Sequence, residues 1–307
     1  MLSRAAFNQS LPPKAKWAVE DIPDLSGKVI IVTGGNTGVG KETVKALLQH
    51  NAKVYLAARN ADKAAKAIEE LKSVTGKEAI FLPLDLSDLH VVRKSAEEFL
   101  SKEKQLHVLF NNAGVMACPM DLLTAQGYDM QIGTNVIGHY FFTSLLLPAL
   151  EATSASGEKA RVVTTSSVVA YFAKEFVFDA VQDGPQRKKL GPRDLYNISK
   201  LGDALFAIEL SRRLGDKVIS VAVNPGNIKT DLQRHMPSWQ RPLNAMLYPS
   251  PMGALTQLWA GVSPEGANLN GQFVVPWARV GSAPVKAQDP ALGGKLWLWA
   301  DELCRGF

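Results

Sequence analysis

Short apolar runs rich in β-branched residues recur along the chain, and segments with helical periodicity separate most of them. Such runs predict strands that are buried on both faces, and they lie at 28–33, 53–58, 79–84, 107–110, 161–165 and 217–223. Helical patterns are found at 61–75, 121–150 and 253–262, and the run 272–275 predicts a final edge strand. This alternation predicts an α/β fold with a doubly wound, mostly parallel sheet and helices on both of its faces.

The two ends of the chain depart from this pattern. Residues 1–27 predict an irregular lead-in, because their three prolines oppose regular structure, and Trp17 is expected to pack onto the main body. Apolar residues in the tail 281–307 predict a terminal helix that packs on the body or on a second subunit; they are Leu292, Leu296, Trp297 and Trp299. Residues 28–280 are expected to form a single domain.

A glycine-rich turn joins the first predicted strand to a helical pattern. Gly34, Gly38 and Gly40 space this turn as G-x-x-x-G-x-G, which differs from the usual dinucleotide fingerprint G-x-G-x-x-G. A strand, a glycine turn and a helix in this order allow backbone N–H groups at the helix N-terminus to cradle a pyrophosphate. The alternative is a turn in which the glycines serve only the geometry of the chain.

The end of the second predicted strand carries a basic residue where an acidic one would bind the 2′-hydroxyl of NAD. Arg59 lies 19 residues after Gly40, and no acidic residue occurs between Val54 and Ala61. An Arg at this point of a doubly wound sheet accommodates the 2′-phosphate of NADP. The position therefore favours NADP, and the alternative is a solvated surface Arg.

Polar and small residues also stand at the ends of the other predicted strands. They are Asp85, the run 111–114 (Asn-Asn-Ala-Gly), the pair Ser166 and Ser167, and the segment 224–230. Ligands of such sheets sit beyond the carboxyl ends of the strands, so this concentration is stronger evidence than any single motif. Asn135 lies among apolar residues, where burial without partners would be costly. It is either functional or a core residue with its hydrogen bonds satisfied.

Tyr196 and Lys200 lie four residues apart in a segment with helical periodicity, so they share one face of one helix. A fixed ammonium near a phenol favours the phenolate, so we expect the pKa of Tyr196 to fall below its usual value of about 10. Such a phenol can donate or accept a proton near neutral pH. The alternative is a chance Tyr-x-x-x-Lys match.

Composition narrows the class of protein. The chain has 307 residues, 46% hydrophobic and 21% charged, which is typical of a globular protein with a sizeable core. Its net charge of +5 comes without a run of Lys and Arg, so no nucleic-acid partner is expected. Cys118 and Cys304 are its two cysteines. They offer no metal-ligand spacing and no disulfide framework, which favours a reducing, cytoplasmic location without a bound metal.

Membrane insertion is not expected either. No segment approaches 18 consecutive apolar residues, and the N-terminal stretch has no apolar core of signal-peptide length. Weak peripheral association with lipid is ranked low, because the sequence contains no separate amphipathic anchor.

Taken in order, these motifs resemble those of the short-chain dehydrogenase/reductase family, in its single-domain branch. The resemblance covers roughly residues 26–280, and the spacing of the glycine turn from Thr33 to Gly40 is the one typical of the family. The interval from Ser167 to Tyr196 is 29 residues and holds an aromatic stretch at 171–178 followed by a charged loop. This is similar to retinol dehydrogenase-like and protochlorophyllide reductase-like members and to fungal reductases. The resemblance implies a Rossmann fold.

The resemblance also implies the residues of the site. The catalytic residues would be Asn135, Ser167, Tyr196 and Lys200, with Ser167 chosen over Ser166 because the family's catalytic Ser is usually the second of such a pair. The residues implied at the cofactor are Gly34, Asn36, Thr37, Gly38, Val39, Gly40, Arg59, Asp85, Asn112, Ala113, Gly114, Tyr196, Lys200, Pro225, Ile228 and Thr230.

Each catalytic residue has an implied role. Tyr196 would exchange the proton with the substrate oxygen, and Ser167 would stabilise the charge that develops there. Lys200 would lower the pKa of Tyr196 and hold the nicotinamide ribose. Asn135 would hold a water molecule that links Lys200 to solvent.

The function implied is an NADP(H)-dependent oxidoreductase, a carbonyl reductase or alcohol dehydrogenase, that transfers hydride between NADPH and a small molecule. The apolar, proline-interrupted stretch 231–252 suggests a hydrophobic substrate beneath a lid at about 227–252, and ordinary packing is the alternative. The competing hypothesis is a non-catalytic NADP(H)-binding regulatory protein on the same fold. Homodimers and homotetramers are common in the family, and the sequence is compatible with either.

Overall fold

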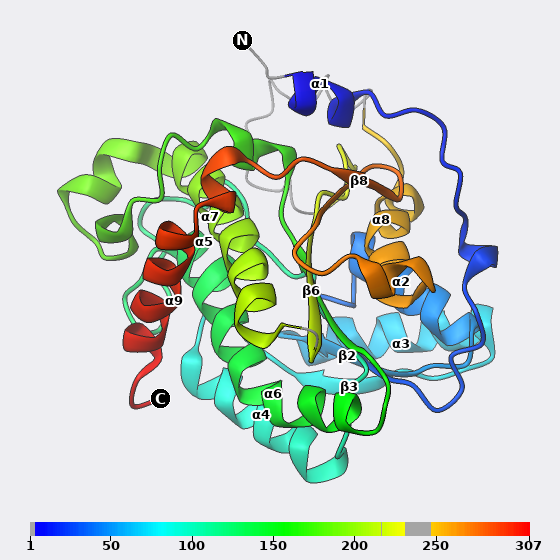
Figure 1. Ribbon diagram of the computed structural model, residues 1–307. Coiled ribbons are helices and arrows are strands. Elements are labelled where there is room, and N and C mark those ends of the chain that lie inside the picture. The colour runs from blue at the N-terminus through cyan, green and yellow to red at the C-terminus, as the bar shows by residue number, and fades with distance from the viewer. Residues whose placement is uncertain (1–3, 216, 231–246) are drawn as a thin grey trace.

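The computed structural model describes residues 4–215, 217–230 and 247–307. Its centre is a sheet whose described strands run in the order β3-β2-β1-β4-β5-β6-β7-β8 (Figure 1). The strands are β1 Val29–Thr33, β2 Lys53–Ala58, β3 Ile80–Pro83, β4 Val108–Asn111, β5 Ala160–Thr165, β6 Val218–Val223, β7 Phe273–Val275 and β8 Arg279–Gly281. All neighbours pair parallel except β7 and β8, which are antiparallel. The predicted mostly parallel, doubly wound sheet is confirmed.

Helices cover both faces of this sheet (Figure 1). One face packs against α2 Gly38–Gln49, α3 Ala61–Thr75 and α8 Ser250–Val262. The other face packs against α4 Leu89–Lys102, α6 His139–Ala155 and α7 Pro185–Leu214. Within β1, Ile30 and Val32 join the first core while Ile31 joins the second. The strand is apolar throughout because alternate side chains enter different cores.

The first 27 residues contain more regular structure than predicted. Helix α1 spans Arg4–Ser10, and a 3₁₀ turn, η1, spans Val19–Asp21. The prolines do lie outside both elements, but they do not prevent a helix upstream. Gln9 is buried, and its amide accepts a hydrogen bond from Asn224 and donates one to Tyr171. The helix is therefore held by contacts with residues far along the chain, which a local pattern does not reveal.

Two further segments differ from expectation. The helix predicted over 121–150 begins only at Met130, with α5 Met130–Ile132 and a π-helical turn, η2 Gly133–Gly138, ahead of α6. Leu123 and Asp129 before it form an antiparallel bridge around a turn at Gly127. The loop expected after the aromatic stretch is largely the start of α7, which is helical from Pro185 and interrupted at Gly191. The 3₁₀ turns η3 Val168–Phe172 and η4 Phe178–Val181 precede it.

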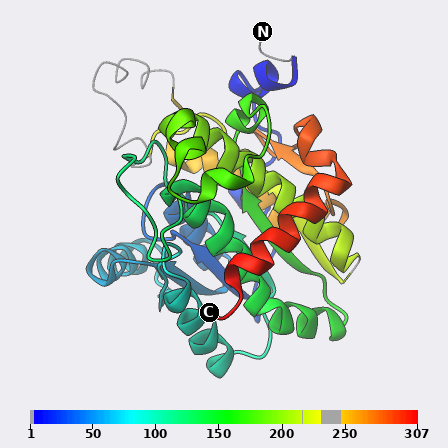
Figure 2. The ribbon, with the colours of Figure 1, turned by 90° about the vertical axis from the view of Figure 1, so that its left-hand side faces the viewer.

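The predicted C-terminal helix is α9, Pro290–Cys304, and it packs on its own chain. Figure 2 shows it in red, lying across the helices that cover this face of the sheet. The Trp297 ring lies 5.0 Å from the ring of Tyr140 on α6, and the Arg213 guanidinium of α7 lies 4.6 Å from the Trp297 ring. Two short turns, η7 Glu265–Asn268 and η8 Val285–Gln288, complete the described elements. The domain boundaries drawn at residues 27 and 280 remain predictions.

Candidate active site

The glycine turn lies between β1 and α2 and forms the floor of a cavity of about 630 Å³. Helix α2 begins at Gly38, whose φ of +53° lies in the left-handed region that favours glycine. A Cβ on Gly40 would lie 2.3 Å from the carbonyl oxygen of Gly34, so no larger residue fits there. The first N–H groups of a helix have no acceptor within the helix, so those of α2 can hold an anionic group such as a pyrophosphate.

The cavity follows the carboxyl ends of the strands. The chain order reverses between β1 and β4, and ligands of doubly wound sheets bind beside such a reversal. Every residue that the sequence implied at the cofactor lines this cavity, and so do Ser167, Tyr196 and Lys200. Asn135 is the one implied residue that does not line it. The structure thus gathers residues that lie up to 196 positions apart, from Gly34 to Thr230.

One end of the cavity is rich in cations. Arg59 follows β2, and its Nε lies 3.8 Å from a carboxylate oxygen of Asp85. Sequence reasoning missed Lys41 on α2 and Lys63 and Lys66 on α3, which line the same end. Lys41 pairs with Glu70. The sequence could have indicated Lys63 and Lys66. Asn60 is a candidate N-cap for a helix that follows directly on the second strand, and residues three positions apart lie on one face of a helix.

Thr33 ties the ends of β1 and β4 together beneath the cavity. Its buried hydroxyl donates to the Phe110 carbonyl (3.1 Å) and accepts from the backbone N–H groups of Asn112 (2.9 Å) and Ala113 (3.0 Å). The Asn112 amide donates in turn to the Thr33 carbonyl at 2.8 Å. These bonds fix the backbone of the run 111–114, which allows a ligand to approach it closely.

Asn135 sits on the π-helical turn η2 and faces the protein interior. Its Oδ1 accepts from the Val115 N–H at 2.8 Å, and its Nδ2 donates to the Val115 carbonyl (3.0 Å) and to the Ser199 hydroxyl (2.9 Å). Its side chain therefore joins the loop after β4 to α7. Isolated π-turns inside helices are frequent at functional sites. The water-holding role of Asn135 stays a prediction.

Ser166 and Ser167 differ in what their hydroxyls contact. The Ser166 hydroxyl is buried and donates to the Lys200 carbonyl at 2.6 Å, so it ties β5 to α7. Ser167 is the N-cap of η3, and its hydroxyl accepts a 3.4 Å bond from the Val169 N–H. The Ser167 hydroxyl therefore makes the longer hydrogen bond of the two, and its catalytic role stays a prediction.

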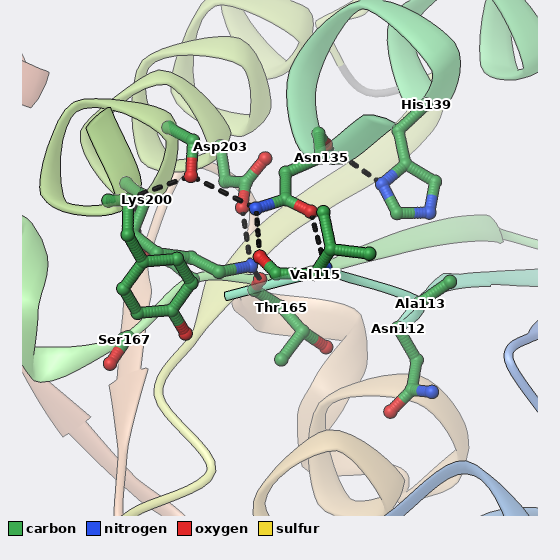
Figure 3. A network of polar contacts seen from close by, with 12 residues as sticks. Asn112, Ala113, Val115, Asn135, His139, Thr165, Ser167, Lys200 and Asp203 are labelled. Atoms are coloured by element: carbon green, nitrogen blue, oxygen red, sulfur yellow. Dashed lines mark hydrogen bonds and ion pairs between the residues drawn. The ribbon is translucent and has the colours of Figure 1, made fainter. Parts of the chain in front are cut away.

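Tyr196 and Lys200 lie on one face of α7, and the Lys200 ammonium is 5.9 Å from the Tyr196 ring centre. The ammonium donates to the Thr165 carbonyl (2.8 Å) and to Oδ2 of Asp203 (2.7 Å), as Figure 3 shows. Sequence reasoning missed Asp203. An acidic residue three positions after a helical Lys is the signal that could have found it.

The predicted direction of the Tyr196 pKa is wrong. Burial raises the pKa of the Tyr196 phenol; the Lys200 ammonium opposes this rise, and the Asp203 carboxylate adds to it. Desolvation penalises the phenolate, and the ammonium that was expected to stabilise it is paired with a carboxylate. The phenol is consequently protonated at neutral pH.

The segment predicted as a substrate lid is described only at its ends. Residues 231–246 lie outside the described residues. Ile228 and Tyr248 form a parallel bridge, with the Lys229 N–H donating to Tyr248 (2.9 Å) and the Tyr248 N–H donating to Asn227 (2.8 Å). The two ends of the segment are therefore joined beside Pro225 and Ile228 of the cavity.

The sequence predicted neither a bound metal nor a membrane-spanning helix, and the described part of the chain can be searched for both. Across residues 4–215, 217–230 and 247–307, no group of three His, Cys, Asp or Glu side chains is arranged to hold a metal ion. Within the same ranges, no helix combines the length and apolar character that crossing a membrane requires. Cys118 and Cys304 are both buried.

Comparison with known proteins adds to this geometry. Residues 28–178 match the family model described as short chain dehydrogenase. A short-chain dehydrogenase/reductase of Armillaria gallica is 60% identical, over 98% of both chains. Human retinol dehydrogenase 11 is 37% identical, over 89% of this chain and 84% of that protein. A crystal structure of an uncharacterised protein from Mycobacterium paratuberculosis superimposes with a TM-score of 0.74 at 27% identity, covering 95% of this chain and 98% of the other.

Proposed function

Because this chain belongs to the short-chain dehydrogenase/reductase family, as its motifs predicted, we propose that it is an NADP(H)-dependent carbonyl reductase or alcohol dehydrogenase. The observation that carries the proposal is the convergence of Ser167, Tyr196 and Lys200 on one cavity with the glycine turn. This places groups able to manage a proton and an oxyanion next to a surface suited to a dinucleotide.

The proposed reduction uses Tyr196 as the proton donor to the oxygen of the substrate carbonyl. Burial raises the pKa of this phenol, so the proton is present at neutral pH. The Ser167 hydroxyl donates a hydrogen bond to the same oxygen and stabilises the charge that develops on it. Lys200 would hold the nicotinamide ribose. A reduced nicotinamide, when bound, supplies the hydride.

The choice of NADP(H) over NAD(H) rests on charge at one end of the cavity. Arg59, Lys63 and Lys66 line that end, and β2 ends without an acidic residue. A 2′-phosphate carries negative charge that these cations can balance, and an Arg is suited to such a group because of its planar array of donors. An acidic residue, by contrast, would bind the 2′-hydroxyl of NAD.

The hydrophobic character of the substrate is also part of the proposal. The apolar composition of 231–252 supports it, together with Val115 and Ile228, which line the cavity. A cytoplasmic location is likewise proposed, because a chain with two cysteines offers no disulfide framework and suits a reducing compartment.

A binding titration tests the cofactor. The purified protein is expected to bind NADPH more tightly than NADH, as followed by nicotinamide fluorescence. Arg59→Asp is expected to weaken NADPH binding by roughly 10- to 100-fold, because it removes a charge-assisted contact and adds a repulsive charge. NADH binding should change much less.

Arg305→Asp is the matched control for this titration. The side chains of Arg59 and Arg305 are equally exposed, at 68%, and Arg305 does not line the cavity. The control variant should therefore keep the preference for NADPH. Equal affinity for both nucleotides in the unchanged protein, or a preference that survives Arg59→Asp, would refute the assignment of NADP.

A further inference from the structure

A carboxylate with no assigned function lies beside Lys200. Asp203 is one helical turn further along α7, and its side chain is 2% exposed. Its Oδ2 is 2.7 Å from the Lys200 ammonium, while its Oδ1 is buried and has no hydrogen-bond partner among the described residues. Figure 3 shows Lys200 and Asp203 joined as an ion pair. A half-satisfied carboxylate in the interior is costly, so its presence calls for a physical account.

The pair is isolated from most other charge. The described titratable groups whose pKa responds to it are Tyr196 on the same helix and His139 on α6. Burial lowers the pKa of His139 to about 3, so this ring is neutral. Burial raises the pKa of Asp203 to about 6, so the carboxylate is charged at neutral pH and above. Tyr196 therefore faces one positive and one negative charge that are close together.

We propose that Asp203 is a positioning residue that holds the Lys200 ammonium against the Thr165 carbonyl and cancels, at Tyr196, most of the field of that ammonium. The inference deepens the proposed function and rests on it for the meaning of the proton transfer. Tyr196 then keeps its proton over the neutral range because burial and the Asp203 carboxylate together outweigh the ammonium, and Lys200 keeps its proton in spite of burial because it has an opposite charge in contact.

The direction of the expected effect follows from charge balance. Asp203→Asn removes one negative charge from a buried cluster, so the first proton leaves the Tyr196–Lys200 pair at lower pH. A phenolate with an ammonium and a phenol with a neutral amine differ only in where one proton sits. The two forms therefore rise together with pH, and the apparent pKa belongs to the pair. Removal of a neighbouring charge typically moves such a value by roughly one to two units.

The absorbance of tyrosinate, followed as a function of pH, tests this inference without substrate or cofactor. The chain has 6 tyrosines, so each protein is compared with its own Tyr196→Phe counterpart to isolate the signal of Tyr196. We expect the phenolate of Tyr196 to appear at lower pH in Asp203→Asn than in the unchanged protein. An unchanged or higher onset would overturn the proposal.

Glu209→Gln provides the control for an acid-to-amide change on the same helix. Glu209 is buried, pairs with Arg212 and Arg213, and does not line the cavity. Its substitution should leave the Tyr196 titration where it was. Asp203→Glu, which keeps the charge, should restore most of the normal onset.

A second pair of variants covers the case in which Asp203→Asn does not fold. Lys200→Met combined with Asp203→Leu removes both charges and leaves no unpaired ion, a replacement that buried pairs often tolerate. If the two charges cancel at Tyr196, the Tyr196 phenolate should appear in the double variant within about half a pH unit of its onset in the unchanged protein. Lys200→Met alone should delay the phenolate to higher pH. A large delay in the double variant as well would show that Lys200 acts on Tyr196 without cancellation.

The kinetic readout separates this inference from the proposed function. If alcohol oxidation with NADP is measured across pH, the acid limb of kcat/KM should move to lower pH in Asp203→Asn by the same one to two units, roughly. Absence of turnover in the unchanged protein would count against the proposed function, and the absorbance titration would still decide the role of Asp203. Normal turnover with no shift in either measurement would count against Asp203 alone.

Discussion

Tyr196→Phe is expected to lower the turnover of carbonyl substrates by about 10²- to 10⁴-fold, the usual contribution of a positioned proton donor. The substitution removes one hydroxyl and keeps the buried ring. NADPH binding should stay within about threefold of the unchanged protein, because the glycine turn and Arg59 supply most of the proposed contacts. Steady-state kinetics and nicotinamide fluorescence measure the two effects separately.

Tyr55→Phe is the matched control for the loss of a phenol. Tyr55 is a buried residue of β2 whose hydroxyl donates to Glu103 at 2.6 Å, and it does not line the cavity. Its loss should leave kcat unchanged. Retention of more than a tenth of the activity in Tyr196→Phe would contradict its role as the proton donor. If the unchanged protein binds NADPH but reduces no member of a carbonyl panel, the regulatory hypothesis gains support.

The sequence predicted those parts of the fold that depend on local pattern. Strands β1 to β6 lie within one residue of the expected bounds, because runs of apolar β-branched residues between glycines and polar turns are visible locally. Strand β3 was expected to be buried on both faces, but it lies at the edge of the sheet and is only partly buried. Strand β8 was missed because Arg279–Gly281 is short and has no apolar alternation. Helix α1 was missed because the hydrogen bond between Gln9 and Asn224 joins residues 215 positions apart.

In the candidate site, too, the sequence predicted the features that depend on local pattern and missed those that depend on distant contacts. The spacing of Tyr196 and Lys200 and the glycine turn are short motifs, and the structure brings them to one cavity. The pKa of Tyr196 was predicted in the wrong direction because it depends on two facts that a motif does not carry. These are the burial of Tyr196 and the charge of Asp203 beside Lys200. Electrostatic consequences depend on the environment of a motif as well as on its residues.

Arg187, a buried residue near the start of α7, gives the prediction with the largest expected effect on stability. Arg187 and Asp129 are each 2% exposed and form an ion pair at 2.9 Å. The Arg187 guanidinium also donates to the carbonyls of Met120 (2.8 Å) and Leu122 (3.2 Å). Asp129 in turn caps α5, accepting from two backbone N–H groups just before the π-helical turn of Asn135. One side chain thus holds the loop before α5 to the start of α7.

Arg187→Leu is expected to lower the free energy of unfolding by about 3–5 kcal/mol, because it leaves the Asp129 carboxylate buried without its partner. Urea denaturation followed by circular dichroism measures the change as a lower midpoint. Arg193→Leu is the control, since Arg193 is exposed on the same helix and its loss should shift the midpoint little. Combining Arg187→Leu with Asp129→Leu should recover part of the loss, because no buried charge of the pair is then left without its partner. The recovery should be incomplete, because the carbonyls of Met120 and Leu122 and the N–H groups capped by Asp129 lose their partners. An Arg187→Leu variant that unfolds at the same urea concentration as the unchanged protein would show that the ion pair contributes no net stability.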